Sequence, residues 1–140
     1  MAIPTKLLLE IVTPDRAIVR DETDEIQVPG AEGYLGILPG HTPLLATMKV
    51  GGLWYRIGQE KHHLAIAGGF VEVLPDRVTV LAQIAERAQD IDLTRAEAAR
   101  KRAEERLARP PIDFDIERAR VALLKSLIRI QVASYARTRA

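Results

Sequence analysis

The pattern of apolar and polar positions along the chain changes near residue 86. Before that point apolar residues come in short runs, several of them alternating with polar residues as in half-buried strands. After it, apolar residues recur at spacings of three and four, as they do along one face of a helix. The pattern therefore predicts two domains, a β domain over residues 1–86 and a two-helix domain over residues 87–140.

The short apolar runs of the first half are separated by turn-forming glycine, proline and aspartate, at the regular spacing of a small all-β domain. In the last two runs the alternation is clear enough to place one face inward, and Pro75-Asp76 between them predicts a tight hairpin. We expect an antiparallel β-sandwich or flattened barrel. The predicted strands are Lys6–Val12, Ala17–Arg20, Glu25–Pro29, Leu44–Val50, Leu53–Ile57, His62–Ala67, Phe70–Leu74 and Val78–Leu81, with Gly51-Gly52, Gly58-Gln59 and Gly68-Gly69 as further dividers.

Two helices are predicted in the second half. Asp92 is a suitable N-cap for a helix that runs to residues 106–108, and Pro110-Pro111 ends it, because proline lacks the amide hydrogen and disfavours helix in the residue before it. Asp113 or Asp115 caps a second helix that reaches about Arg137. The predicted contact stripes are Ala96, Ala99, Ala103 and Leu107 on the first helix, and Ile116, Ala119, Leu123, Leu127 and Ile130 on the second.

The net charge of +1 hides an asymmetry between the halves. Residues 1–86 carry 7 basic and 11 acidic side chains, whereas residues 87–140 carry 13 basic and 8 acidic ones. From Arg118 onward there are six basic residues and no acid, which fits either a solvated helix face or a surface for an acidic partner or polyanion. If the hairpin closes with these faces inward, four cations converge and favour a phosphate-bearing ligand: Arg95, Arg102, Lys125 and Arg129.

Several classes of chemistry are disfavoured by composition. The chain has no cysteine, so disulfides and thiolate metal sites are excluded. No leader pattern and no apolar run of about 20 residues is present, so we expect membrane association only through a partner. His62 and His63 are adjacent on a predicted strand and point to opposite faces, and His41 is alone, so no metal site is expected.

The glycine-rich stretch at residues 30–42 superficially resembles a phosphate-binding loop. A Walker loop needs Gly-Lys-Ser/Thr, and the corresponding triplet here is Gly40-His41-Thr42, without lysine. A backbone-exposed turn used for contact is the preferred interpretation.

Five segments of the chain together form a specific pattern: Leu9–Arg16, Gly33–Leu45, Gly68–Val73, Val78–Ala82 and Ile91–Ala96. The most specific part is the loop Gly-Tyr-Leu-Gly-Ile-Leu-Pro-Gly-His-Thr-Pro-Leu-Leu, followed by a Gly-Gly-Phe strand. Together these segments resemble the epsilon subunit of bacterial F-type ATP synthases, and the resemblance covers essentially the whole chain.

The resemblance implies a central-stalk rotor subunit without an active site, held peripherally at the cytoplasmic face of the cell membrane by the rest of the complex. It implies that the sandwich binds the gamma subunit and contacts the c-ring, coupling proton-driven rotation to ATP synthesis. The c-ring contact would be carried by Glu32, Gly33, Tyr34, His41 and Thr42. Tyr34 stands where the family commonly has an acid, which removes a charge pair but leaves an amphipathic contact residue.

The resemblance also implies a regulatory role for the hairpin. When it extends, its basic second helix would reach the alpha/beta catalytic hexamer and inhibit ATP hydrolysis, through Arg118, Arg120, Lys125 and Arg129. When it is folded, some members bind ATP without hydrolysing it; no cofactor is required. The positions that match this regulatory ATP site are Glu86, Ile91, Asp92 and Ala96 on the adenosine side, and Arg95, Arg102, Lys125 and Arg129 on the phosphate side. Lys125 replaces an arginine and lacks its bidentate fork.

Simpler or different interpretations remain at this stage. Asp92 can be a helix cap alone, and Arg95 a solvated or paired side chain. A nucleic-acid-binding module would use the basic arm, but the β domain is acidic and only six aromatic side chains are present, so we expect no nucleic acid partner. A stand-alone enzyme would have to show turnover, for which no residue pairing is visible.

Overall fold

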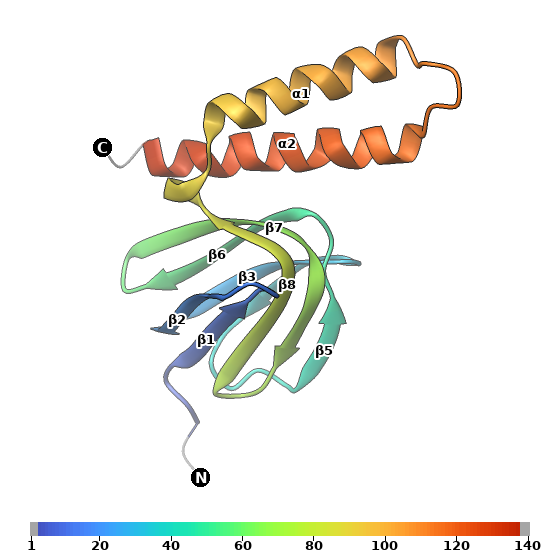
Figure 1. The fold of residues 1–140 in the computed structure, drawn as a ribbon. Coiled ribbons are helices and arrows are strands. Elements are labelled where there is room, and N and C mark those ends of the chain that lie inside the picture. Colours follow the sequence, from blue (N-terminus) through green and yellow to red (C-terminus); the bar gives the residue numbers. More distant parts are fainter. Residues whose placement is uncertain (1–2, 138–140) are drawn as a thin grey trace. The chain divides into compact units, whose positions relative to one another are not determined.

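The computed structural model describes residues 3–137, which form two compact units that divide between Arg87 and Ala88 (Figure 1). The first unit contains the strands and the second contains the helices. The strands are β1 (Leu7–Val12), β2 (Ala17–Thr23), β3 (Glu25–Gly30), β4 (Gly33–Ile37), β5 (Leu44–Thr47), β6 (Gly51–Ile57), β7 (Glu60–Val73) and β8 (Arg77–Arg87). The helices are the 3-10 turn η1 (Ala88–Asp90), α1 (Leu93–Ala108) and α2 (Ile116–Arg137).

The strands follow the order β2-β1-β8-β7-β6-β3-β4, and β5 pairs separately with β7. All pairs but one are antiparallel, so the predicted β-sandwich is confirmed. The exception is β1 with β8, which run parallel from Leu8 opposite Arg77 to Val12 opposite Leu81. This pair departs from the antiparallel pattern of the predicted sandwich, because the partner of β1 lies about seventy positions away and no local turn defines its direction.

Strand alternation places the core where the sequence predicted it. Val71 and Val73 of β7 are fully buried, and Val78 and Val80 of β8 lie beside them on the same face. The Pro75-Asp76 hairpin is confirmed: the Leu74 amide donates to the Arg77 carbonyl at 2.8 Å. The alternating residues of β1 complete this side of the core: Leu7, Leu9 and Ile11.

Three glycine segments were expected to separate strands but belong to them. Strand β4 lies inside the stretch at residues 30–42, Gly51-Gly52 begin β6, and Gly68-Gly69 lie within β7. Gly69 has a φ of 114°, and a Cβ atom there would lie 2.0 Å from the Leu81 carbonyl oxygen of β8. Glycine at this position therefore allows the backbones of two paired strands to approach closely. From the sequence alone, such a glycine looks like the end of a strand.

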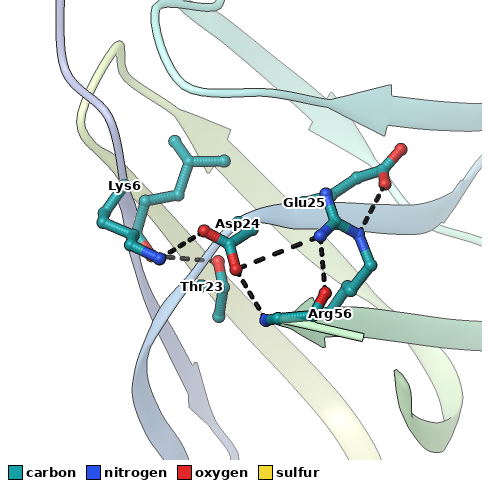
Figure 2. Close-up of polar contacts among 7 residues, drawn as sticks. Lys6, Thr23, Asp24, Glu25 and Arg56 are labelled. Atoms are coloured by element: carbon teal, nitrogen blue, oxygen red, sulfur yellow. Dashed lines mark hydrogen bonds and ion pairs between the residues drawn. The ribbon is translucent and has the colours of Figure 1, made fainter. Parts of the chain in front are cut away.

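A polar cluster links Lys6, the junction of β2 and β3, and β6 (Figure 2). The Asp24 carboxylate pairs with Lys6, accepts from the Gly58 amide at 2.7 Å and lies 4.0 Å from Arg56. Arg56 Nε also donates to Glu25 at 3.1 Å. The hydrogen bond from Lys6, followed by that from Gly58, lowers the pKa of Asp24 below its ordinary value.

The helical unit is a hairpin in which α1 and α2 lie side by side (Figure 1). Asp92 caps α1 as predicted, its Oδ1 accepting from the Arg95 amide at 3.1 Å. Asp115 caps α2 in the same way, accepting from the Arg118 amide at 3.1 Å. Helix α1 ends before Pro110, as expected from the missing proline amide.

The contact stripe predicted for α1 is confirmed at Ala96 and Ala103, which are buried, but that of α2 was partly wrong. Ile116 and Leu127 are 46% and 43% exposed, and Ser126 is buried instead. Each step of four residues turns about 40° past a full helical turn, so the step from 119 to 123 to 127 drifts away from the partner helix. The less exposed side follows mixed steps of four and three, with Leu123 and Ile130 half-buried and the other three buried: Ala119, Leu123, Ser126, Ile130 and Ala133.

Candidate functional site

The first candidate surface is the segment from Gly30 to Thr47, in which β4 and β5 border a groove of about 530 Å³. Several apolar side chains along this segment are accessible: Tyr34 and Leu38 are each 54% exposed and Leu45 is 70% exposed. Lys49 places its ammonium group 5.5 Å from the centre of the Tyr34 ring. Accessible apolar side chains gathered around a groove are typical of a protein contact surface.

The residues predicted for c-ring contact all lie in this segment. Glu32 and Tyr34 are exposed and flank Gly33. Gly33 has a φ of 139° and lies at the tight connection between β3 and β4. His41 Nδ1 lies 2.6 Å from the carbonyl oxygen of the exposed Thr42. Part of the predicted exposed turn is strand β4, so Tyr34 is presented on regular backbone, opposite Pro29 of β3.

A second accessible apolar pair lies on β7 and β8. Phe70 and Leu81 are directly opposite each other in the ladder and are 52% and 53% exposed. They border a cavity of about 310 Å³, together with the turn that follows β1 at Thr13 and Pro14. Two large exposed apolar side chains in one cross-strand pair also favour a partner contact.

The hairpin carries seven of the eight residues matched to a regulatory ATP site. In the helical unit Asp92 and Arg95 are exposed at the start of α1, Ala96 is buried, and Ile91 is half-buried. The eighth residue, Glu86, is half-buried in β8 opposite Ala65, in the other unit.

The cations predicted to converge are distributed along the two helices. Arg102 is exposed on α1, and Lys125 and Arg129 are half-buried on α2, one turn apart. Arg102 lines a cleft at the end of the hairpin where the helices are joined; Arg95, Lys125 and Arg129 are not among the residues that line it. Their convergence on one phosphate group stays a prediction.

This cleft, which we call the loop-end cleft, has a volume of about 660 Å³. It is lined by α1 from Ala99 to Arg106, by the connecting segment 111–115, and by α2 as far as Ala122. Arg106 was not singled out from the sequence, although its spacing of four from Arg102 places both on one helix face.

Neither described helix is long and apolar enough to cross a bilayer.

Comparison with known proteins agrees with this two-part architecture. Residues 6–88 match the family model of the ATP synthase delta/epsilon chain beta-sandwich domain, and residues 89–134 match that of the long alpha-helix domain. The ATP synthase epsilon chain of Solibacter usitatus is 45% identical over 130 residues, covering 93% of this chain and 97% of the relative. That of Syntrophobacter fumaroxidans is 49% identical over 128 residues, covering 91% and 96%.

A chain in the cryo-EM structure of the Euglena gracilis mitochondrial ATP synthase, containing OSCP, F1 and c-ring, has the same fold. The TM-score is 0.79 at 23% identity, over 99% of this chain and 84% of that one.

A β-sandwich followed by a long-helix hairpin defines a two-domain subunit class of ATP synthases, the delta/epsilon chains. Within that class, the chain belongs to the ATP synthase epsilon chain family. The resemblance inferred from the sequence is thereby confirmed.

Proposed function

We propose that this chain is a non-catalytic rotor subunit of the central stalk, which couples proton-driven rotation to ATP synthesis and restrains ATP hydrolysis. The observation that carries the proposal is the match of both domains to the family, over residues 6–88 and 89–134. Its partners would be the gamma subunit, the c-ring and the alpha/beta hexamer, at the cytoplasmic face of the cell membrane. The relatives that support it are epsilon chains matched over nearly their full length.

The sandwich would bind its partners through its two accessible apolar surfaces. The segment with Glu32, Gly33, Tyr34, His41 and Thr42 is the proposed c-ring contact, supported by the exposure of Tyr34 and its apolar neighbours. The Phe70–Leu81 pair is the proposed gamma contact, supported by the burial that such large side chains would gain in a complex.

Co-purification with a gamma subunit tests the rotor assignment independently of the hairpin. The full chain should retain gamma, and Phe70→Ser with Leu81→Ser should weaken retention by at least about tenfold, since each buried side chain of this size contributes about 1.5–3 kcal/mol. Ile57→Ser is the matched control, because Ile57 is also exposed on the sandwich but lies at the β6–β7 turn. Absence of gamma binding by the unmodified chain would overturn the assignment.

The hairpin would act as a movable regulatory element. In its extended state α2 would present Arg118, Arg120, Lys125 and Arg129 to acidic segments of the catalytic hexamer. In its closed state it would bind ATP between Glu86, Ile91, Asp92 and Ala96 on one side and the four cations on the other. ATP would shift the equilibrium only through its preference for the closed state, about 1.4 kcal/mol for each tenfold difference in affinity.

Calorimetric titration of the isolated chain tests ATP binding. We expect a saturable heat at millimolar ATP or below, strongly reduced in Arg95→Ala with Arg129→Ala. Lys101→Ala with Arg120→Ala removes the same charge from exposed positions outside the proposed site and should bind as the unmodified chain does. Absence of binding, or equal loss in both double variants, would remove the ATP claim, and ATP turnover by the isolated chain would contradict a non-catalytic role.

A further inference from the structure

The loop-end cleft is lined by three arginines from two helices. Arg102 and Arg106 lie one turn apart on α1, and Arg118 lies in the first turn of α2. Three cations around one concave surface repel one another unless an anion lies between them. The arrangement therefore has the character of an anion site.

These three guanidinium groups have no ion pair of their own. Within residues 3–137, no carboxylate lies within 4.0 Å of any of them. Other arginines on the same helices are paired: Arg100 lies 3.7 Å from Glu104, and Arg120 lies 3.0 Å from Glu117. The guanidinium donors of these cleft-lining arginines are thus available to a ligand.

Two acids also line the cleft, and neither neutralises the arginines directly. Asp115 is already engaged as the N-cap of α2, where its Oδ1 accepts from the Arg118 amide. Asp113 lies in the turn with a φ of 61°, a left-handed conformation that aspartate tolerates. Basic groups remain in excess, and the positive end of the α2 dipole adds to them.

The remaining wall of the cleft is apolar. Ala99, Ala103, Ala119 and Ala122 are small and leave room between the helices, and Phe114 is half-buried at the turn. A volume of about 660 Å³ lies within the ordinary range for organic ligands. Inorganic phosphate would leave most of this apolar surface uncovered.

We propose that the loop-end cleft binds a small organic phosphate, with its phosphate between Arg102, Arg106 and Arg118 and its organic part against Phe114 and the alanines. Such a ligand would join α1 to α2 at the end of the hairpin where they are connected. This site goes beyond the regulatory ATP site proposed above and shares only Arg102 with it. Loss of either site would therefore leave the other testable.

Nuclear magnetic resonance titration of the full chain with phenyl phosphate tests the proposal, at constant ionic strength. Saturable shifts should centre on the amides of residues 112–119, with inorganic phosphate binding at the same place more weakly. Arg106→Gln with Arg118→Gln should weaken phenyl phosphate binding at least about tenfold, because two charge-assisted hydrogen-bond donors are lost. Arg106→Lys with Arg118→Lys keeps the charge but loses the bidentate guanidinium. Its affinity for phenyl phosphate should lie between that of the unmodified chain and that of the glutamine double variant.

Lys101→Gln with Arg120→Gln is the matched control, because it removes one cation from each helix outside the cleft. Its affinity should stay within about threefold of the unmodified chain, as expected for screened surface charges. If phenyl phosphate affinity fell equally in both glutamine double variants, binding would reflect general electrostatic attraction to the helices, and the proposed site would be overturned. Shifts centred on residues 92–96, equal affinity for the two phosphates, or no saturable shift would also overturn it.

Discussion

Gly69 offers the sharpest test of how the sandwich is held together. It lies in β7 opposite Ala82 of β8, with a φ of 114°, far from the conformations that side chains with a Cβ normally adopt. A Cβ atom there would lie 2.0 Å from the Leu81 carbonyl oxygen and 2.8 Å from the Ala82 Cα. Because both neighbours are backbone atoms, β7 and β8 must move apart to accept alanine.

The cost can be assembled from two parts. Holding a non-glycine residue at such a φ costs about 1–3 kcal/mol. Separating the strands also disturbs buried backbone hydrogen bonds around Gly69, whose carbonyl accepts from the Met48 amide at 2.8 Å, and each one left unmade costs about 1–3 kcal/mol. We expect Gly69→Ala to lower the free energy of unfolding by about 2–6 kcal/mol, a large share of the total of a domain this small.

Urea unfolding followed by Trp54 fluorescence measures this loss, because Trp54 is the only tryptophan and lies in β6 of the sandwich. Gly36→Ala is the control, since a Cβ atom there meets nothing within 4 Å. Gly68→Ala should cause an intermediate loss of stability, because its Cβ would meet the flexible side chain of Gln83 at 3.2 Å. A Gly69→Ala protein as stable as the Gly36→Ala protein would refute the reasoning.

Three further predictions concern the helix cap and two titrating groups. Asp92→Ala should lower local stability by about 1 kcal/mol, seen as faster amide exchange in the first turn of α1; unchanged exchange there would contradict the capping role. The pKa of Asp24 is lowered by Lys6, so its contribution is present above about pH 4 and lost as pH falls through the folded pKa. Asp24→Asn should therefore flatten the acid arm of the stability curve, measured by urea unfolding, and an unchanged acid arm would contradict the role of this carboxylate. Burial, followed by the charge of Asp21, raises the pKa of Tyr55 to about 12, so stability should fall between about pH 10 and 12 as the unfolded form ionises first. Tyr55→Phe should remove this part of the alkaline loss, and an unchanged alkaline curve would count against it.

Local signals in the sequence were sufficient for much of the architecture. Alternation in the segments around Val71 and Val78 assigned their buried faces, because strand side chains alternate whatever the strand pairs with. Asp92 and Pro110 bounded α1, because caps and proline act on backbone groups within a few residues. The family likeness rested on similarly contiguous segments, which the comparisons then confirmed.

Other features depend on contacts between distant parts of the chain. Whether Gly69 interrupts a strand or lies within one depends on how closely Leu81 approaches. Whether Leu127 or Ser126 faces α1 depends on the angle at which two helices pack, which a list of apolar residues leaves open.

The sequence alone determined that a strand-rich half precedes two helices, that Asp92 caps the first helix, and the family, because these follow from neighbouring residues. Only the tertiary structure decided the parallel pairing of β1 with β8 and the cleft that joins Arg102 and Arg106 to Arg118. The physical reason is that pairing and packing set distances between residues far apart in the chain, and local conformational preference carries no information about those distances.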